Sequence, residues 1–427
     1  MLTRRDFLGS IAAVGVGGVM RPASAGSVAH RLRPEALSVT IGETTQTMLG
    51  FNGSWPGPEL RVGQGDDVSV QVDNRLDEGT LVHWHGLRLP NRMDGVNVLT
   101  QEVIPPGRTF DYRFAAKDAG TFWYHSHYIA FDQVSRGLFG PLIVEEAAPP
   151  DVDLDLTVQL FDLLVDNAGQ YQEDFPADQF TGAGRMGNVV RALMPARSVQ
   201  QGARLRLRLI NPSIDRVYRV QIGGVDGHIV ALDGMPLLAP RAVGEIVLAP
   251  GQRCDVIGDV TGDVVLFDGG NRIGQVSVNG ARARRNIPLP TLRPNTMPRP
   301  SSQPIQATLT LQGGAGGGGH GGFGTWALND VSGLPRSPLV DVRRGTSVRL
   351  RIENATGFDH VMHLHGHHFW ELDPTTDAVG DYRDGTFIRA GDTRDILCVL
   401  DNPGNWMLHC HMLSHQADGM GTWLRVR

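Results

Sequence analysis

Gly120-Thr121-Phe122-Trp123-Tyr124-His125-Ser126-His127 has a counterpart 284 residues further along the chain, Gly404-Asn405-Trp406-Met407-Leu408-His409-Cys410-His411. A second matched pair lies upstream at an offset of 280 residues, where His83-Trp84-His85-Gly86 corresponds to His363-Leu364-His365-Gly366. Two motifs that keep nearly the same spacing in two places indicate a duplicated unit. The unit has the size of a whole domain, which argues against a solenoid of short repeats.

The segments before these motifs alternate between apolar and polar residues, and a third copy of the pattern lies between the other two. The alternating apolar positions are Val68, Val70, Val72; Leu205, Leu207, Leu209; and Val348, Leu350, Ile352. Period-two alternation between turn signals predicts half-buried β-strands. In the middle copy, Val220 and Ile222 stand where the other copies have histidine.

The repeat therefore predicts an all-β chain of three consecutive β-sandwich domains at residues 33–147, 152–288 and 303–427. Pro149-Pro150 and the proline-containing stretch 288–304 are the expected linkers. The chain has 427 residues with 54 glycines and 26 prolines, which fits a turn-rich all-β protein. Its formal net charge of −6 argues against nucleic acid as a partner.

The N-terminus has the pattern of an export signal. Paired Arg4 and Arg5 precede an apolar stretch over residues 8–20, and Ala23-Ser24-Ala25 forms an A-x-A cleavage site. This resembles a twin-arginine signal peptide over residues 1–25 and predicts a periplasmic or secreted protein. An ordinary secretory signal with two chance arginines is the alternative. The apolar stretch is too short for a membrane anchor, so no span is expected after cleavage.

Four His-x-His pairs carry the chemistry of the chain. They are His83/His85, His125/His127, His363/His365 and His409/His411. Residues i and i+2 of a strand point to the same face, so each pair directs two imidazoles toward one point. Together the first and third domains supply eight nitrogen ligands, a set that suits copper, zinc, iron or nickel.

Cys410 selects copper among these metals. It lies between two of the paired histidines, and a His-Cys-His-Met set is completed by His360, His415 and Met420. Such a set, with a weak axial methionine, is typical of blue-copper electron-transfer sites. The first domain has Ser126 at the matching position, so that copy cannot form the site.

With these motifs the chain resembles the three-domain multicopper oxidases, in particular the laccase-like bacterial members. Further matches to the first domain of that family are Asn52-Gly53, Pro56-Gly57-Pro58, Asp94-Gly95 and Ile104-Pro105-Pro106-Gly107. The resemblance covers nearly the whole mature chain. It implies three cupredoxin-like Greek-key β-sandwich domains, of which the middle one has no copper ligands.

The resemblance also implies four coppers per chain and a ligand set for each. The type 1 copper takes His360, Cys410, His415 and Met420; the type 2 copper takes His83 and His363. The type 3 coppers take His85, His125, His411 and His127, His365, His409. Cys410 is bonded through the backbone to His409 and His411, which gives a short electron path between the two kinds of site.

Four weaker features complete the expectations. Asp94 matches an acidic residue that the family places near the trinuclear cluster as a proton relay, although a plain turn before Gly95 is the alternative. Gln416 stands where many bacterial members have glutamate. Cys254 and Cys398 are expected as buried thiols rather than a disulfide, and the glycine-rich segment 313–324 as a flexible connector rather than a substrate lid.

The expected function is one-electron oxidation of phenols or aromatic amines, coupled to reduction of dioxygen to water. Thr356 and Phe358 replace the acidic residue and the methionine found before the first type 1 histidine in Cu(I)-specialised members. Phe358 is expected to stack with an organic ring. A cuprous oxidase or ferroxidase, for which Asp359 is a possible cation ligand, and a copper-sequestering resistance protein are the alternatives. The sequence does not predict the oligomeric state.

Overall fold

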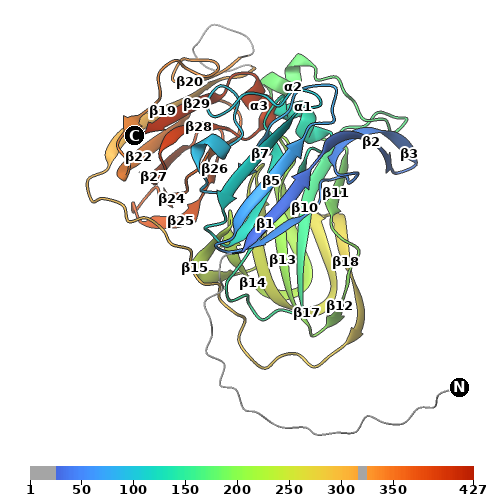
Figure 1. Cartoon of the computed structure of the whole chain (residues 1–427). Helices are drawn as coiled ribbons and strands as arrows, with labels where there is room; N and C mark the ends of the chain where they lie inside the picture. Colours follow the sequence, from blue (N-terminus) through green and yellow to red (C-terminus); the bar gives the residue numbers. More distant parts are fainter. Residues whose placement is uncertain (1–25, 316–324) are drawn as a thin grey trace, which may run out of the picture.

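The computed structural model describes residues 26–315 and 325–427. The predicted export signal at 1–25 and most of the glycine-rich segment 313–324 lie outside the described residues. Within the described ranges the chain is almost entirely β-strand (Figure 1). The helices there are short: α1 (Ala130–Ser135), α2 (Ala177–Thr181), α3 (Leu413–Ala417) and the 3-10 turn η1 (Asn91–Met93). The predicted all-β fold class is confirmed.

The N-terminal part of the chain forms two facing sheets and a hairpin. One sheet has the order β1 (Ser27–Leu32), β5 (Asp67–Asp73), β7 (Thr109–Ala115). The other has the order β4 (Leu60–Gly63), β9 (Phe139–Glu145), β8 (Gly120–Ser126), β6 (Val82–His85). The hairpin is β2 (Pro34–Ile41) and β3 (Thr44–Phe51). Val68, Val70 and Val72 are buried as the alternation predicts, because their face of β5 packs into the sandwich.

The C-terminal part repeats this plan. One sheet has the order β20 (Trp326–Leu328), β19 (Ile305–Gly313), β22 (Thr346–Asn354), β27 (Thr393–Leu400), β24 (Phe369–Leu372), β25 (Val379–Arg383). The other has the order β21 (Asp341–Val342), β29 (Gly421–Val426), β28 (Gly404–Cys410), β23 (His360–Leu364), β26 (Gly385–Ile388). Strand β6 pairs with β8 and β23 with β28, so the repeated motifs occupy equivalent strands.

The middle part forms a nine-stranded sheet system with its own core. Its strands are β10 (Leu154–Leu163), β11 (Val189–Leu193), β12 (Ser198–Gln201), β13 (Arg204–Ile210), β14 (Tyr218–Leu232), β15 (Met235–Ala242), β16 (Ile246–Leu248), β17 (Arg253–Asp268) and β18 (Asn271–Ala281). Figure 1 shows it, in green and yellow, below the blue N-terminal and orange C-terminal parts.

The expectation of a half-buried strand is wrong for β13, in which every residue is buried. Arg204, Arg206 and Arg208 lie on the face that was expected to be solvated. Each guanidinium is paired with a carboxylate, namely Asp259, Asp255 and Asp155 respectively. Arginine tolerates burial when its donors are paired, and here Arg206 and Arg208 also contact Glu146 and Thr121 of the N-terminal part.

Among the described helices, none combines the length and the apolar character needed to cross a membrane.

Candidate metal centre

Eight buried histidines converge where the N-terminal and C-terminal sandwiches meet. The register places His83 opposite His125 in one sandwich and His363 opposite His409 in the other. Ligand atoms within 4.8 Å of one another define three groups: His83, His85, His363; His85, His125, His411; and His127, His365, His409. We call these eight residues the histidine cluster. All are the residues of the four His-x-His pairs predicted from the sequence.

The ring nitrogens of the histidine cluster fall into two classes. The outward nitrogens are hydrogen-bonded; for example, Nδ1 of His125 donates to the carbonyl of Ser126 and Nδ1 of His409 to that of Cys410, both at 2.8 Å. Other nitrogens are buried without a hydrogen-bond partner in the described structure: Nε2 of His83, His125, His127 and His363, Nδ1 of His85, and both nitrogens of His411.

Buried polar atoms without partners are rare and cost about 1–3 kcal/mol each. Here they are imidazole nitrogens gathered at one place, and imidazole is a good ligand for copper and zinc. The residues present therefore fit a group of bound metal ions. Burial, followed by the mutual repulsion of neighbouring imidazoles, also lowers the pKa of His127 to about 3. A neutral ring is the form that binds a metal.

Asp94 joins the histidine cluster from η1, as the resemblance implied. Its backbone carbonyl accepts a hydrogen bond from Nδ1 of His83 at 2.8 Å. Its buried carboxylate accepts one from Nδ1 of His365, in the other sandwich, at 2.9 Å. The carboxylate therefore does more than shape the turn before Gly95, because it orients a histidine from the C-terminal part.

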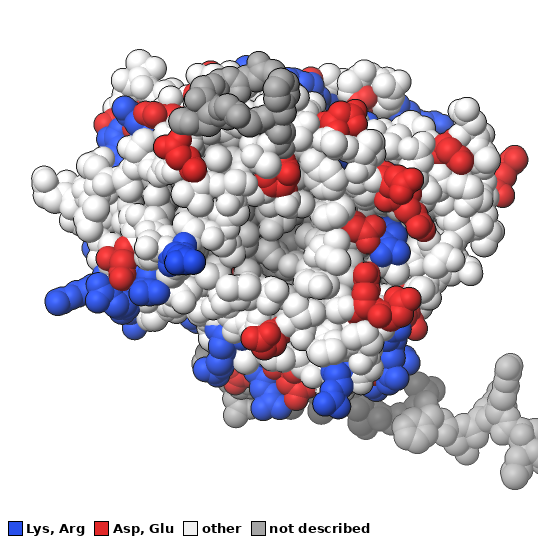
Figure 2. Space-filling view, turned by 90° about the horizontal axis from the view of Figure 1, so that it is seen from above, with Lys and Arg blue, Asp and Glu red and all other residues white. Residues whose placement is uncertain are grey.

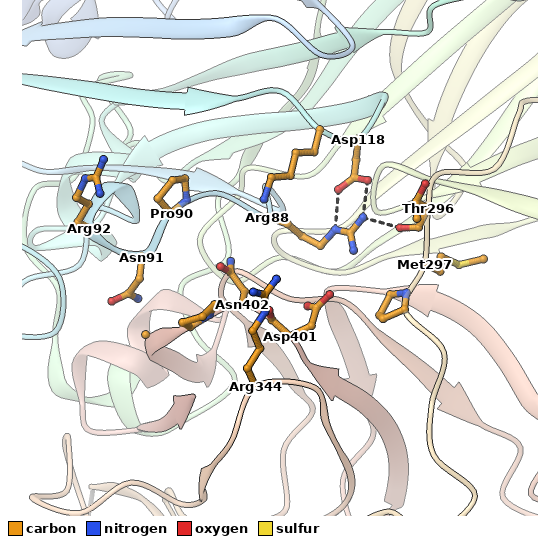
Figure 3. Close-up of a pocket in the computed structure, with 14 residues that line it drawn as sticks. Arg88, Pro90, Asn91, Arg92, Asp118, Thr296, Met297, Arg344, Asp401 and Asn402 are labelled. Carbon is orange, nitrogen blue, oxygen red and sulfur yellow. Dashed lines mark hydrogen bonds and ion pairs between the residues drawn. The ribbon is translucent and has the colours of Figure 1, made fainter. Parts of the chain in front are cut away.

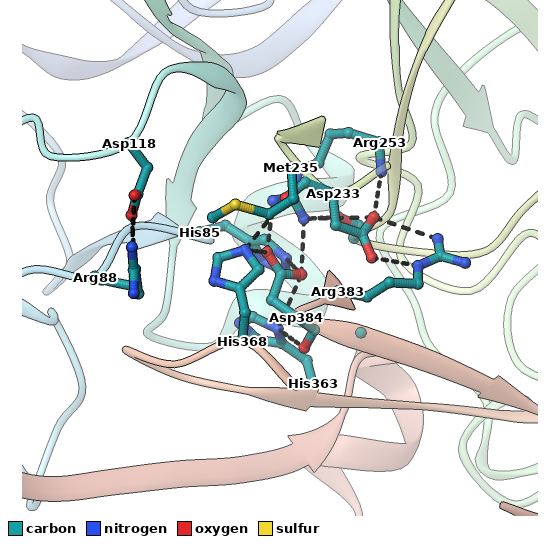
Figure 4. A network of polar contacts seen from close by, with 12 residues as sticks. His85, Arg88, Asp118, Asp233, Met235, Arg253, His363, His368, Arg383 and Asp384 are labelled. Carbon is teal, nitrogen blue, oxygen red and sulfur yellow. Dashed lines mark hydrogen bonds and ion pairs between the residues drawn. The ribbon is translucent and has the colours of Figure 1, made fainter. Parts of the chain in front are cut away.

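Asp384 is the counterpart that sequence reasoning missed. Its backbone carbonyl accepts from Nδ1 of His363 at 2.9 Å, and its carboxylate contacts Nε2 of His85, in the N-terminal sandwich, at 3.3 Å (Figure 4). Burial would raise the pKa of Asp384, but the charge of Arg253 and the contacts with His85 and His363 hold it well below its usual value. Each aspartate thus joins a histidine of its own sandwich to one of the other, and Asp384 also contacts His368.

A second group, which we call the cysteine site, consists of Cys410, His360 and His415. The Sγ atom of Cys410 lies 3.6 Å from Nδ1 of His360 and 3.8 Å from Nδ1 of His415. Met420 is buried and is tied to the site through its backbone, which bonds to Cys410 and His415. Burial raises the pKa of the Cys410 thiol to about 12, so a thiolate here needs the positive charge of a bound cation.

The outer nitrogens of the cysteine site are held by residues that carry no motif. Nε2 of His360 lies 2.9 Å from Oγ1 of Thr356. Nε2 of His415 donates to the carbonyl of Gly182, in the middle part of the chain, at 2.9 Å. Both contacts leave the Nδ1 atoms free to face Cys410. Thr356 drew attention in the sequence only as a replacement for an acidic residue.

Trp326 is an aromatic side chain that packs against both imidazoles of the cysteine site. The Trp326 ring lies 4.9 Å from that of His360 and 4.3 Å from that of His415, centroid to centroid. Phe358 instead packs edge-on against Trp326 at 5.6 Å. No repeat or spacing in the sequence marked Trp326.

The remaining expectations for cysteine and histidine hold. Cys254 and Cys398 are buried free thiols. His367 binds the backbone, with Nδ1 toward the carbonyl of His365 and Nε2 accepting from Asn402. His368 contacts the carbonyl of Asp233 at 3.2 Å. Both histidines are buried and contact backbone groups.

A cavity of about 880 Å³ in the described structure is separate from both sites (Figure 3). Its charged lining residues are Arg88, Arg92, Lys117, Arg344, Asp118 and Asp401. No member of the histidine cluster or of the cysteine site lines it. The guanidinium of Arg88 is already held by both carboxylate oxygens of Asp118, at 2.6 and 2.7 Å.

Comparison with known proteins agrees with this geometry. Three models described as multicopper oxidase match residues 35–149, 159–264 and 300–427. The chain is 42% identical to Lac15 from a marine microbial metagenome, whose crystal structure superposes with a TM-score of 0.81; the match covers 93% of this chain and 99% of that one.

Two curated relatives are more distant. Multicopper oxidase MmcO of Mycobacterium tuberculosis is 28% identical, with 99% of this chain and 92% of the relative covered. Laccase-1 of Botryotinia fuckeliana is 29% identical, with 87% of this chain and 77% of the relative covered. These matches extend over all three parts of the chain.

Proposed function

The chain belongs to the multicopper oxidase family, and we propose that it oxidises small aromatic donors at the cysteine site and delivers the electrons to dioxygen at the histidine cluster. It is a laccase-like oxidoreductase that uses copper. The observation that carries the proposal is the set of buried imidazole nitrogens without partners. They are gathered next to a buried cysteine whose two chain neighbours, His409 and His411, belong to the histidine cluster.

We assign four coppers to these side chains. The type 1 copper is held by His360, Cys410, His415 and Met420, and the type 2 copper by His83 and His363. The type 3 coppers are held by His85, His125, His411 and by His127, His365, His409. Bound there, copper supplies one-electron redox chemistry at the first site and a store of electrons for dioxygen at the other three. The last two sets match two of the three geometric groups of the histidine cluster.

The backbone around Cys410 connects the two sites. Cys410 ends β28, and its neighbours His409 and His411 direct their rings into the histidine cluster. The carbonyl of Cys410 also accepts a hydrogen bond from Nδ1 of His409 at 2.8 Å. An electron that enters at Cys410 therefore reaches the histidine cluster through one neighbouring residue, either His409 or His411.

Asp94 is the proposed source of protons for oxygen reduction. Its carboxylate is buried beside His365 and His83, where a carboxyl group can give and take protons during turnover. Gln416, on the neighbouring α3, carries no carboxylate, so it cannot share this task. The dependence on Asp94 is accordingly expected to be strong.

Donor selectivity follows from the surroundings of the cysteine site. The hydroxyl of Thr356 is occupied by His360 and Asn354, so it offers no soft ligand for Cu(I). Seen from above, much of the surface is uncharged, with acidic side chains mainly on the right of the view and basic ones mainly along its lower and left edges (Figure 2). The ring of Phe358, which is partly exposed and packs against the buried Trp326, suits an organic ring.

We further propose that the protein is exported. The paired arginines, apolar stretch and A-x-A sequence of residues 1–25 support a twin-arginine signal. Mass measurement of the protein from a secreting host, with N-terminal sequencing, tests this. A mature chain that retains residues 1–25 would contradict it.

The decisive experiment is steady-state oxygen consumption with phenols, aromatic amines, Cu(I) and Fe(II), with copper content measured alongside. We expect about four coppers per chain, red-light absorption from the thiolate, and the highest kcat/KM for the aromatic donors. A tenfold preference for Cu(I) or Fe(II) would favour the metal-oxidase alternative. Copper binding without turnover of any donor would favour copper sequestration.

A further inference from the structure

Arg253, the first residue of β17, connects all three parts of the chain beside the histidine cluster (Figure 4). Its guanidinium is fully buried. It donates to both carboxylate oxygens of Asp384 at 2.8 and 2.5 Å, to the carbonyl of Thr121 at 3.2 Å and to that of Gly251 at 3.0 Å. Asp384 lies in the C-terminal part and Thr121 in the N-terminal part.

From these contacts we propose that Arg253 is a positioning residue for the histidine cluster and acts through Asp384. Asp384 in turn contacts Nε2 of His85 with its carboxylate and Nδ1 of His363 with its backbone carbonyl. The other nitrogen of each ring, Nδ1 of His85 and Nε2 of His363, is buried and has no hydrogen-bond partner in the described structure. The middle part of the chain, which supplies no copper ligand, therefore sets the direction of two ligands. This inference rests on the proposed function of the cluster.

Two glycines leave the space that this arrangement needs. A Cβ atom on Gly86, which has φ +87°, would lie 2.2 Å from Nη2 of Arg253 and 2.6 Å from Oδ2 of Asp384. A Cβ atom on Gly251, which has φ +82°, would lie 2.9 Å from Cε1 of His85. The backbone of the middle part thus packs directly against a histidine of the cluster, on the side where Arg253 enters.

The equivalent aspartate of the other sandwich is held differently. Among the described residues, the ion pairs of Asp94 are with His83 and His365 only. An arginine therefore pairs with the aspartate on one side of the histidine cluster, Asp384, and not with the aspartate on the other side, Asp94. Loss of Arg253 is expected to disturb the half that contains His85 and His363 and to spare the cysteine site.

Arg204 provides a matched control. It is also a buried arginine of the middle part, paired with Asp259 at 2.8 Å and bonded to the carbonyls of Ile287 and Pro288. None of these partners contacts the histidine cluster. Arg204→Met and Arg253→Met remove the same group from similar surroundings, and they differ only in what the guanidinium holds.

The test measures copper per chain, red absorbance and the electron paramagnetic resonance spectrum of the non-blue copper in the purified holoproteins. For Arg253→Met we expect full red absorbance but an altered non-blue spectrum, with affinity for cluster copper reduced about tenfold, as is usual when the residues that orient ligands are changed. Arg204→Met should lower only the melting temperature. An unchanged spectrum in Arg253→Met, or the same change in both variants, would overturn the inference.

Two further variants exclude misfolding and locate the effect. Arg253→Lys keeps the charge but cannot donate to both oxygens of Asp384, so we expect the same spectral change in a weaker form, even if Arg253→Met does not fold. Arg253→Lys should add nothing in an Asp384→Asn background, because the arginine acts through that carboxylate. Additive effects would overturn this. A wild-type protein without copper signals would instead refute the proposed function.

Discussion

The cysteine site and the same location in the first sandwich share one backbone plan and differ in their side chains. Thr80 corresponds to His360, and each pairs with an isoleucine across a β-bridge, Ile104 and Ile388 respectively. In the first sandwich, Oε1 of Gln133 lies 2.9 Å from Oγ1 of Thr80 and 2.5 Å from Oγ of Ser126. In the third, two imidazole nitrogens face the sulfur of Cys410.

The comparison shows which side chains a metal site needs in addition to the shared backbone. In the first sandwich the hydroxyls and the amide satisfy one another, and Nε2 of Gln133 is occupied by the carbonyl of Gly79. In the third, Thr356 and Gly182 satisfy only the outer nitrogens of His360 and His415. The inner nitrogens, Nδ1 of His360 and Nδ1 of His415, lie 3.1 Å apart and both face Sγ of Cys410. One copy is therefore a network of hydroxyls and an amide, and the other gathers the ligand atoms of a metal site.

We expect the largest effect on activity when the third sandwich is given the serine that the first sandwich has at this position. Cys410→Ser places the hydroxyl of the first sandwich beside the two imidazoles, and a hydroxyl is not a soft anionic ligand. We expect loss of the red absorbance and a fall in donor oxidation of about a thousandfold or more, while the histidine cluster still binds copper. Spectroscopy, metal analysis and oxygen consumption check this.

Cys398→Ser is the control for this substitution. Cys398 is also a buried free thiol of the third sandwich, but its Sγ atom contacts only the carbonyl of His368 among its hydrogen-bond partners. Its substitution should leave the red absorbance intact. Full oxidase activity in Cys410→Ser would remove Cys410 from the electron path.

The first sandwich has no cysteine site of its own, so we expect a substitution there to affect oxygen reduction and not oxidation of the donor. Asp94→Asn keeps the shape of the side chain but removes the proposed proton source, and positioned acid–base groups contribute about 100-fold or more. We expect oxygen reduction to slow by about that factor, while reduction of the cysteine site by the donor changes little. Stopped-flow measurement of the two half-reactions separates them.

Asp73→Asn is a suitable comparison, since Asp73 is a buried aspartate of the same sandwich that pairs with Arg75 and not with histidine. It should alter stability without changing the ratio of the two rates. Equal slowing of both half-reactions in Asp94→Asn would indicate that Asp94 acts through the structure alone.

The sequence predicted the histidines well because their signal is periodic and duplicated. Spacing of i and i+2 on a strand and the offsets of 280 and 284 identify residues that meet without any knowledge of the loops. The neighbours that hold them, such as Asp384, Arg253 and Gly182, have no such signal. Their contacts join separate domains, so they depend on how the sandwiches pack. Trp326 lies in the same domain as His360 and His415, and it was missed because no repeated motif or spacing marks it.

Thr356 tests one of those neighbours. Thr356→Val keeps the shape of the side chain but removes the hydroxyl that lies 2.9 Å from Nε2 of His360. We expect copper affinity at the cysteine site to fall about tenfold, with the copper of the histidine cluster unchanged. Titration with a copper chelator, followed by red absorbance, measures this. An unchanged affinity would show that the Thr356 hydroxyl is not needed to hold the ring.

The reverse exchange, Ser126→Cys, should have the smallest effect on metal content. The new thiol would face Thr80 and Gln133, which offer a hydroxyl and an amide but no imidazole. Soft thiolate alone does not make a blue site, because the two nitrogen ligands are missing. We expect no additional copper and no new red absorbance, together with a loss of about 1–2 kcal/mol in stability from the weakened hydrogen bonds. Ser126→Ala should lose a similar amount. A fifth copper in Ser126→Cys would mean that the first sandwich remains closer to a metal site than its closed network implies, and that the thiol alone separates the two copies.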